Sequence, residues 1–234
     1  MARHLELTPR LSVLARWVPD GAHLADVGTD HGYLPVWLML HGRIASAIAS
    51  DLRPGPLERA RSSARAYGVE GIDFRLCDGL SGIGPEEADT VVIAGMGGER
   101  IAAILAAAPW TADGAHTLLL QPQTRARELR LFLAGHGYEI SREALVRERG
   151  TLRPAMEVRA GEMPLTLAQS YCGAKLLRDP LGERYIIEET VRLQMAAAGL
   201  ERAGPAGRER ADALRDAVEA LLRMREEWLD VNGL

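Results

Sequence analysis

The stretch LADVGTDHGYLP, residues 24–35, connects a short apolar run to a helical pattern at residues 34–40. A turn of this kind, with Gly28 and Gly32 at the bend, is typical of a strand-to-helix connection in a parallel sheet. Such sheets bind ligands at the carboxyl ends of their strands. The stretch lacks GxGxxG, and the carboxylate of Asp30 would repel a pyrophosphate. It therefore favours a cationic ligand over a dinucleotide.

The segments on both sides of this turn repeat its pattern. Five apolar runs, LADVG, ASAIASD, IDFRLCD, TVVIAGMG and HTLLLQP, alternate with helical patterns at residues 34–40, 56–67, 99–107 and 125–134. This alternation predicts an α/β fold with right-handed crossovers. The last two runs, YEISREALV and PAMEVRAG, are joined by too few residues for a helix, which predicts an antiparallel hairpin at one sheet edge. Five parallel strands and a terminal hairpin fit a class I, Rossmann-like methyltransferase better than a dehydrogenase.

The pattern changes after residue 160. Apolar residues at 186, 190, 193, 197 and 200, and again at 214, 218, 221 and 228, follow helical spacing. The breaker at 204–207 separates the two stripes. We therefore predict a catalytic domain at residues 1–160 and a coiled-coil-like helical hairpin at residues 161–234.

Composition limits the class of protein. The 234 residues carry 28 basic and 32 acidic side chains, a net charge of −4, which excludes nucleic-acid binding by bulk positive charge. Cys77 and Cys172 lack CxxC spacing, so neither a disulfide framework nor a metal site is expected. No apolar run approaches the roughly 18 residues that span a membrane. These features predict a cytoplasmic protein without a membrane anchor, and we expect a monomer.

Acidic residues end three successive apolar runs. Asp26 could accept from an ammonium group, Asp51 from two ribose hydroxyls, and Asp78, beside Gly79, from an adenine amino group. Each alone could be a turn or a helix cap. Together they match S-adenosylmethionine, which combines an adenosine with an ammonium and a sulfonium.

The fourth run ends in Gly95-Met96-Gly97-Gly98. In this fold that strand end faces the transferable methyl group. The chain lacks the Asn/Asp-Pro-Pro-aromatic loop of many amino-methyltransferases, and its three glycines leave room for a flat ring. The alternative is that these small residues only pack a helix against the sheet.

The blocks ADVGTDHGYLP, AGMGGERIAAIL and LLLQPQTRARELRLFL resemble the bacterial TrmK family. Its members use S-adenosylmethionine to methylate N1 of adenine 22 in tRNA and carry a C-terminal helical hairpin. The resemblance implies the same activity, cofactor and substrate here. The cofactor-binding residues are then expected to be Asp26, Gly28, Thr29, Asp51, Leu52, Asp78, Gly79, Gly95 and Met96. The substrate-binding residues are expected to be Tyr33, Gly97, Gly98, Gln121, Pro122, Gln123, Arg10, Arg125 and Arg153.

Adenine N1 has a free lone pair, so the reaction needs alignment and support for positive charge rather than a strong base. We expect Asp30 to supply that support and His31 to orient the turn or contact the base. A helix cap is the alternative for Asp30, and a structural role is the alternative for His31.

Arginines are concentrated in two segments, residues 1–16 and 121–153, and Lys175 is the only lysine. We expect these segments to bind the tRNA backbone, with Arg202, Arg208 and Arg210 at the hairpin tip as a further contact. A solvated charged face is the alternative for any one arginine. Two other functions remain open at this point: a class I methyltransferase for another nucleic acid or a small molecule, and a non-catalytic tRNA- or cofactor-binding module.

Overall fold

The computed structural model describes residues 5–201 and 205–234, and the chain divides into two compact units. The first unit runs to residue 142 and continues over 146–163. The second comprises 143–145 and 164–234. Residues 1–4 of the first arginine-rich segment, Arg202 of the predicted hairpin tip and position 204 of the breaker lie outside the described residues.

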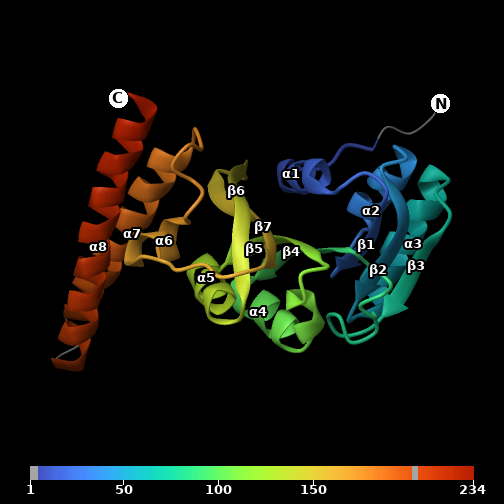
Figure 1. The fold of residues 1–234 in the computed structure, drawn as a ribbon, viewed down its shortest axis with the longest axis horizontal. Helices are drawn as coiled ribbons and strands as arrows, with labels where there is room; N and C mark the ends of the chain where they lie inside the picture. The colour runs from blue at the N-terminus through green and yellow to red at the C-terminus, as the bar shows by residue number, and fades with distance from the viewer. Residues whose placement is uncertain (1–4, 202–204) are drawn as a thin grey trace. The chain divides into compact units, whose positions relative to one another are not determined.

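The first unit is built on one seven-stranded sheet with the order β3-β2-β1-β4-β5-β7-β6 (Figure 1). β1 pairs with β2 and β4, β2 with β3, and β4 with β5, all in parallel, whereas β5 and β7 are antiparallel. The predicted parallel sheet with a hairpin at one edge is confirmed, and β7 is the hairpin strand that contacts β5. The strands are β1 (Ala22–Val27), β2 (Ile44–Asp51), β3 (Ile72–Leu76), β4 (Thr90–Gly97), β5 (Thr117–Thr124), β6 (Tyr138–Glu148) and β7 (Thr151–Ala160).

The central parallel strands are continuous apolar runs because both of their faces are buried. Leu118, Leu119 and Leu120 on β5 are all fully buried, so both faces of this central strand are covered. The edge strand β3 is only partly buried along its length. The first unit's helices are α1 (Pro9–Trp17), α2 (Tyr33–Leu40), α3 (Pro54–Tyr67), α4 (Gly98–Ala106) and α5 (Ala126–Gly135), with a 3₁₀ turn at Pro109–Ala112.

The order of the strands fixes where a ligand can bind. The chain moves outward from β1 to β2 and β3, then returns to add β4 on the other side of β1. The connections after β1 and β4 therefore diverge, which leaves a crevice at the carboxyl ends of these two strands. The 24–35 turn and the glycine-rich 94–98 segment both lie at this switch point.

The second unit is helical. It contains α6 (Leu167–Cys172), α7 (Gly182–Glu201) and α8 (Pro205–Asn232), and α7 packs along α8. The predicted stripe on α7 is buried at Ile186, Thr190, Leu193 and Ala197. On α8 the buried positions include Ala211, Ala217, Leu221, Met224 and Trp228, whereas Leu214 and Val218 are only half-buried.

Arg225 interrupts the predicted apolar stripe of α8, and the structure shows its role. Its guanidinium forms an ion pair with Glu183 on α7 at 2.6 Å, so the charge connects the two helices. None of the described helices is both long and apolar enough to cross a membrane.

Candidate functional site

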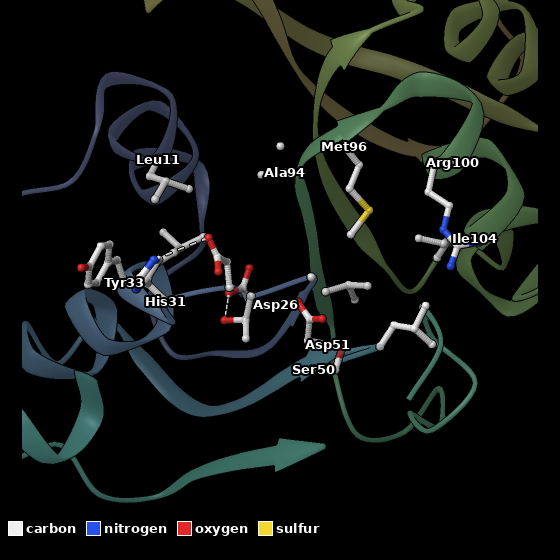
Figure 2. A pocket seen from close by; sticks show the side chains of 18 of the residues that line it. Leu11, Asp26, His31, Tyr33, Ser50, Asp51, Ala94, Met96, Arg100 and Ile104 are labelled. Carbon is white, nitrogen blue, oxygen red and sulfur yellow. Dashed lines mark hydrogen bonds and ion pairs between the residues drawn. The ribbon is translucent and has the colours of Figure 1, made fainter. Parts of the chain in front are cut away.

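A cavity of about 460 Å³ opens at the carboxyl ends of β1, β2 and β4. We call it the strand-end cavity. Its size lies within the range of small-molecule sites. Asp26, Asp51 and Met96 lie near its centre, with His31 and Tyr33 on one side and Arg100 and Ile104 on the other (Figure 2).

The turn after β1 contains three residues in the left-handed backbone conformation. Gly28, Asp30 and Gly32 all have positive φ, at +75°, +48° and +66°. A Cβ at Gly32 would come within 2.9 Å of the Cβ of Ala60 on α3, so this glycine allows the turn to pack closely against α3. Asp30 adopts the left-handed conformation, which aspartate tolerates better than most other residues with a side chain.

Asp26 is one of two buried carboxyls that line the cavity, with 6% of its surface exposed. The hydroxyl of Thr29 donates a hydrogen bond to it at 2.5 Å. Burial raises the pKa of Asp26 to about 6, although the Thr29 hydrogen bond and the charge of Arg10 act in the opposite direction. A cationic group bound here would lower this pKa and stabilise the ionised carboxylate.

Two neighbouring residues end β2 beside Asp26. Asp51 is buried, and its carboxylate accepts a hydrogen bond from the Arg53 backbone N–H at 2.9 Å. The Ser50 backbone carbonyl accepts from the N–H groups of Gly28 and Thr29. The Ser50 hydroxyl is buried and has no hydrogen-bond partner among the described residues. A ligand with polar groups would satisfy it.

Asp30 and its neighbours are more exposed. The Asp30 side chain is 59% exposed and forms an ion pair with Arg59 of α3 at 2.5 Å. His31 Nε2 lies 3.8 Å from the same carboxylate, and the His31 ring stacks on Tyr33 with centroids 5.2 Å apart. Asp30 and His31, the predicted catalytic pair, therefore line the cavity with Tyr33, and Arg59 is the ion-pair partner of Asp30.

Met96 extends from the end of β4 into the strand-end cavity (Figure 2). A Cβ at Gly28 would come within 2.1 Å of the terminal methyl of Met96, so the methionine rests on the glycine of the first turn. The two segments that were predicted independently from the sequence, residues 24–35 and 95–98, are thus in contact.

Asp78 lies apart from the other predicted cofactor residues. It forms an ion pair with Arg100 of α4 and lines a smaller cavity of about 190 Å³. Gly79 does line the strand-end cavity, and so does the half-exposed Leu52. Arg100 and Ile104 line both cavities and therefore form the boundary between them.

A third cavity, of about 370 Å³, borders the strand-end cavity. We call it the arginine cavity. Of the predicted substrate residues, it contains Arg10, Gln123 and Arg153, whereas Tyr33 lines the strand-end cavity. Its lining residues are Thr8, Arg10, Gly95, Gln123, Glu148, Arg149, Thr151 and Arg153.

The remaining predicted substrate residues line neither of these two cavities. Gly98 is buried at the start of α4, where a Cβ would come within 2.1 Å of the Arg125 carbonyl oxygen. Arg125 precedes α5 and forms an ion pair with Glu128. The other three are Gly97, beside the Thr124 hydroxyl, and the buried residues Gln121 and Pro122.

Several lining residues carry no signal in the sequence pattern. Thr8 and Leu11 come from the N-terminal segment and α1, and Ser50 is hidden within an apolar strand. Arg149 was noted only as part of an arginine-rich segment. No group of three or more His, Cys, Asp or Glu side chains in the described part of the chain is arranged to hold a metal ion.

Comparisons with known proteins agree with this geometry. Residues 7–153 match the family model described as a methyltransferase domain. The tRNA (adenine(22)-N(1))-methyltransferase of Bacillus subtilis is 36% identical over 159 residues, which cover 68% of this chain and 67% of that protein.

Solved structures extend the similarity. The crystal structure of the B. subtilis m1A22 tRNA methyltransferase TrmK matches with a TM-score of 0.86 at 29% identity, over 95% of this chain and all of that one. A Streptococcus pneumoniae putative tRNA (m1A22) methyltransferase, solved in complex with S-adenosyl-L-methionine, matches with a TM-score of 0.83 at 32% identity. It covers 94% of this chain and 100% of that chain. The sequence match, the shared fold and the strand-end cavity together establish that this chain belongs to the TrmK family of methyltransferases.

Proposed function

We propose that this protein transfers a methyl group from S-adenosylmethionine to N1 of adenine 22 in tRNA. The single observation that carries the proposal is a cavity with two buried carboxyls, Asp26 and Asp51, bordered by a second cavity rich in arginine. The first has the donor and acceptor groups for the cofactor, and the second has the charge for RNA. The relatives named above carry this activity in their names.

The residues of the strand-end cavity fit the cofactor chemically. The buried Ser50 hydroxyl lacks a partner among the described residues, and burial holds the pKa of Asp26 near 6, which a cationic ligand would relieve. Asp26 would accept from the ammonium group, and Asp51 would accept from the ribose hydroxyls. When bound, S-adenosylmethionine supplies an electrophilic methyl group.

The residues around Asp30 would act on the target base. Adenine N1 has an in-plane lone pair, and methylation leaves the ring positively charged, so no strong base is needed. Asp30 would accept from the N6 amino group or face the developing positive charge. Arg59 holds the Asp30 carboxylate in place, and His31 flanks it on the other side.

The division of labour between the two parts of the chain is also a proposal. Residues 1–160 would form the catalytic domain, and residues 161–234 would add contacts to tRNA through exposed Arg208 and Arg210. We further propose that the protein acts as a monomer. A tRNA substrate also implies a cytoplasmic location.

The test is methyl transfer from labelled cofactor to unmodified tRNA transcripts, with the modified nucleotide mapped by mass spectrometry. We expect a single N1-methyladenosine at position 22. Asp30→Ala should abolish transfer while calorimetry still detects cofactor binding. Cofactor binding by the unaltered protein without transfer to any tRNA would refute the proposed substrate.

A further inference from the structure

The arginine cavity combines three guanidinium groups with one carboxylate. Arg10 reaches it from α1, whereas Arg149 and Arg153 come from the connection between β6 and β7 and from β7 itself. Among the described residues, Glu148 is the only acidic one that lines it. A cavity of about 370 Å³ with this excess of positive charge selects an anion, and the planar fork of arginine matches phosphate oxygens.

Arg10 lies at the boundary between the two cavities. It lines both of them, and its Nε lies 3.3 Å from the Glu148 carboxylate. A Cβ at Gly95 would come within 2.7 Å of an Arg10 nitrogen, so this guanidinium rests directly on the backbone at the end of β4. A ligand in the arginine cavity would therefore lie next to the end of β4, which also lines the strand-end cavity.

Arg149 occupies an unfavourable backbone position. Arg149 and Gly150 form the two-residue turn between β6 and β7, with φ of +49° and +82°. Positive φ at both central residues is the pattern of a type I′ turn, whose first central position prefers Asn, Asp or Gly. An arginine there makes the hairpin less stable than asparagine would. Its side chain is exposed and forms no ion pair or hydrogen bond with any other described residue.

The side chain of Arg153 also lacks an ion-pair partner among the described residues. It is half-buried on β7 and lines the arginine cavity. Many other arginines of the first unit, including Arg43, Arg59, Arg75 and Arg100, pair with carboxylates. Arg149 and Arg153 therefore present their positive charges to a ligand.

We propose that Arg149 and Arg153, together with Arg10, bind the RNA phosphate next to the nucleotide that is methylated. This inference rests on the proposed function, because it assumes that the polyanion is tRNA. The phosphate would anchor the target nucleotide at the end of β4 while its base lies in the neighbouring strand-end cavity. Glu148 keeps Arg10 extended along Gly95 until the phosphate is bound.

Arg149→Asn tests the proposal because stability and binding should change in opposite directions. Asparagine suits the left-handed turn, so the melting temperature should stay constant or rise. The affinity for unmodified tRNA should fall about tenfold through loss of a charge-assisted contact. The slope of log affinity against log salt should decrease in magnitude by about one. The affinity for S-adenosylmethionine, measured by calorimetry, should not change.

Arg65→Gln is the matched control. Arg65 is exposed on α3, outside both arginine-rich segments, and lines neither cavity. Its loss removes the same charge, so we expect less than a twofold change in tRNA affinity. Arg153→Gln should lower the tRNA affinity as Arg149→Asn does. Equal changes in salt slope for Arg65→Gln and Arg149→Asn would overturn the proposal in favour of a diffuse charge effect.

The failure of this inference can be told apart from a failure of the proposed function. If the unaltered protein methylates tRNA but Arg149→Asn binds tRNA as tightly as the unaltered protein does, only the phosphate site is refuted. If the unaltered protein binds S-adenosylmethionine but neither binds nor methylates tRNA, the proposed substrate is refuted, and the phosphate site with it.

Discussion

Replacing Asp26 by asparagine should make the protein more stable and its cofactor affinity lower. The carboxyl of Asp26 has a pKa of about 6 in the folded protein and 3.8 as an ordinary aspartate, a difference of about two pH units. Because the folded-state pKa is raised, the folded protein binds the proton more tightly than the unfolded chain does. Stability therefore falls as the pH rises from about 4 to 6 and is constant above that range.

The magnitude follows from this difference. Each pH unit corresponds to about 1.4 kcal/mol, so the ionised carboxylate costs about 3 kcal/mol at pH 7.5 and about half as much at pH 5. Asparagine removes the charge and keeps an oxygen that can accept from the Thr29 hydroxyl. Asp26→Asn should therefore raise the free energy of unfolding by up to about 3 kcal/mol at pH 7.5, with a smaller gain at pH 5.

Cofactor binding should show the opposite change. An ammonium group needs the ionised form of Asp26, so the dissociation constant of the unaltered protein for S-adenosylmethionine should rise up to tenfold per pH unit below about pH 6. The Asp26→Asn variant should bind weakly, and its affinity should not depend on Asp26 ionisation. The ionised carboxylate of Asp26 thus lowers the stability of the fold and raises the affinity for the cofactor.

Urea unfolding at pH 5 and 7.5 measures the first effect, and calorimetry without urea at the same pH values measures the second. Glu70→Gln is the control, because Glu70 is exposed and its substitution should change stability by less than about 0.5 kcal/mol. An Asp26→Asn variant that is less stable than the unaltered protein at pH 7.5 would show that the reasoning about burial is wrong. An unchanged cofactor affinity would refute the ammonium contact.

Two further substitutions test the position of Asp30 and the packing at the start of α4. Arg59→Gln removes the partner of Asp30, and we expect kcat to fall about tenfold at unchanged cofactor KM, with partial recovery in Arg59→Lys; equal kcat in all three proteins would rule out this positioning role. Gly98→Ala places a methyl group 2.1 Å from the Arg125 carbonyl oxygen and should lower the unfolding free energy by about 2 kcal/mol in a urea titration. Gly135→Ala, which meets open space at the end of a helix, should be neutral or stabilising, and similar losses in both variants would contradict the packing argument.

The sheet and much of the strand-end cavity could be predicted because they follow from local patterns. Alternating strands and helices require parallel pairing, and the carboxyl ends of parallel strands meet at one edge. Asp26 and Asp51 each end such a strand and are adjacent in the cavity for that reason. No comparable rule reaches Thr8 or Leu11, because their place depends on how α1 docks against the sheet.

The sequence pattern was less informative where a side chain had two possible partners. Asp78 also follows a strand, but Arg100, 22 residues later on α4, draws its carboxylate into an ion pair. The pattern of apolar residues does not predict ion pairs between residues that are far apart in the sequence. Gly98 illustrates a second limit, because a glycine beside a ligand and a glycine beside a backbone carbonyl look identical in a sequence.

The strand-end cavity gives the sheet two unequal edges. The turns after β1 and β2 and the end of β4 line this cavity, whereas a Cβ at Gly21, Gly42 or Gly114, in turns that precede strands, would meet open space. Insertions and labels should be tolerated at these turns, because they line neither the strand-end cavity nor the arginine cavity. A fluorophore attached near Gly114 should therefore leave tRNA binding undisturbed. Variants of the strand-end cavity could then be compared with the same fluorophore in place.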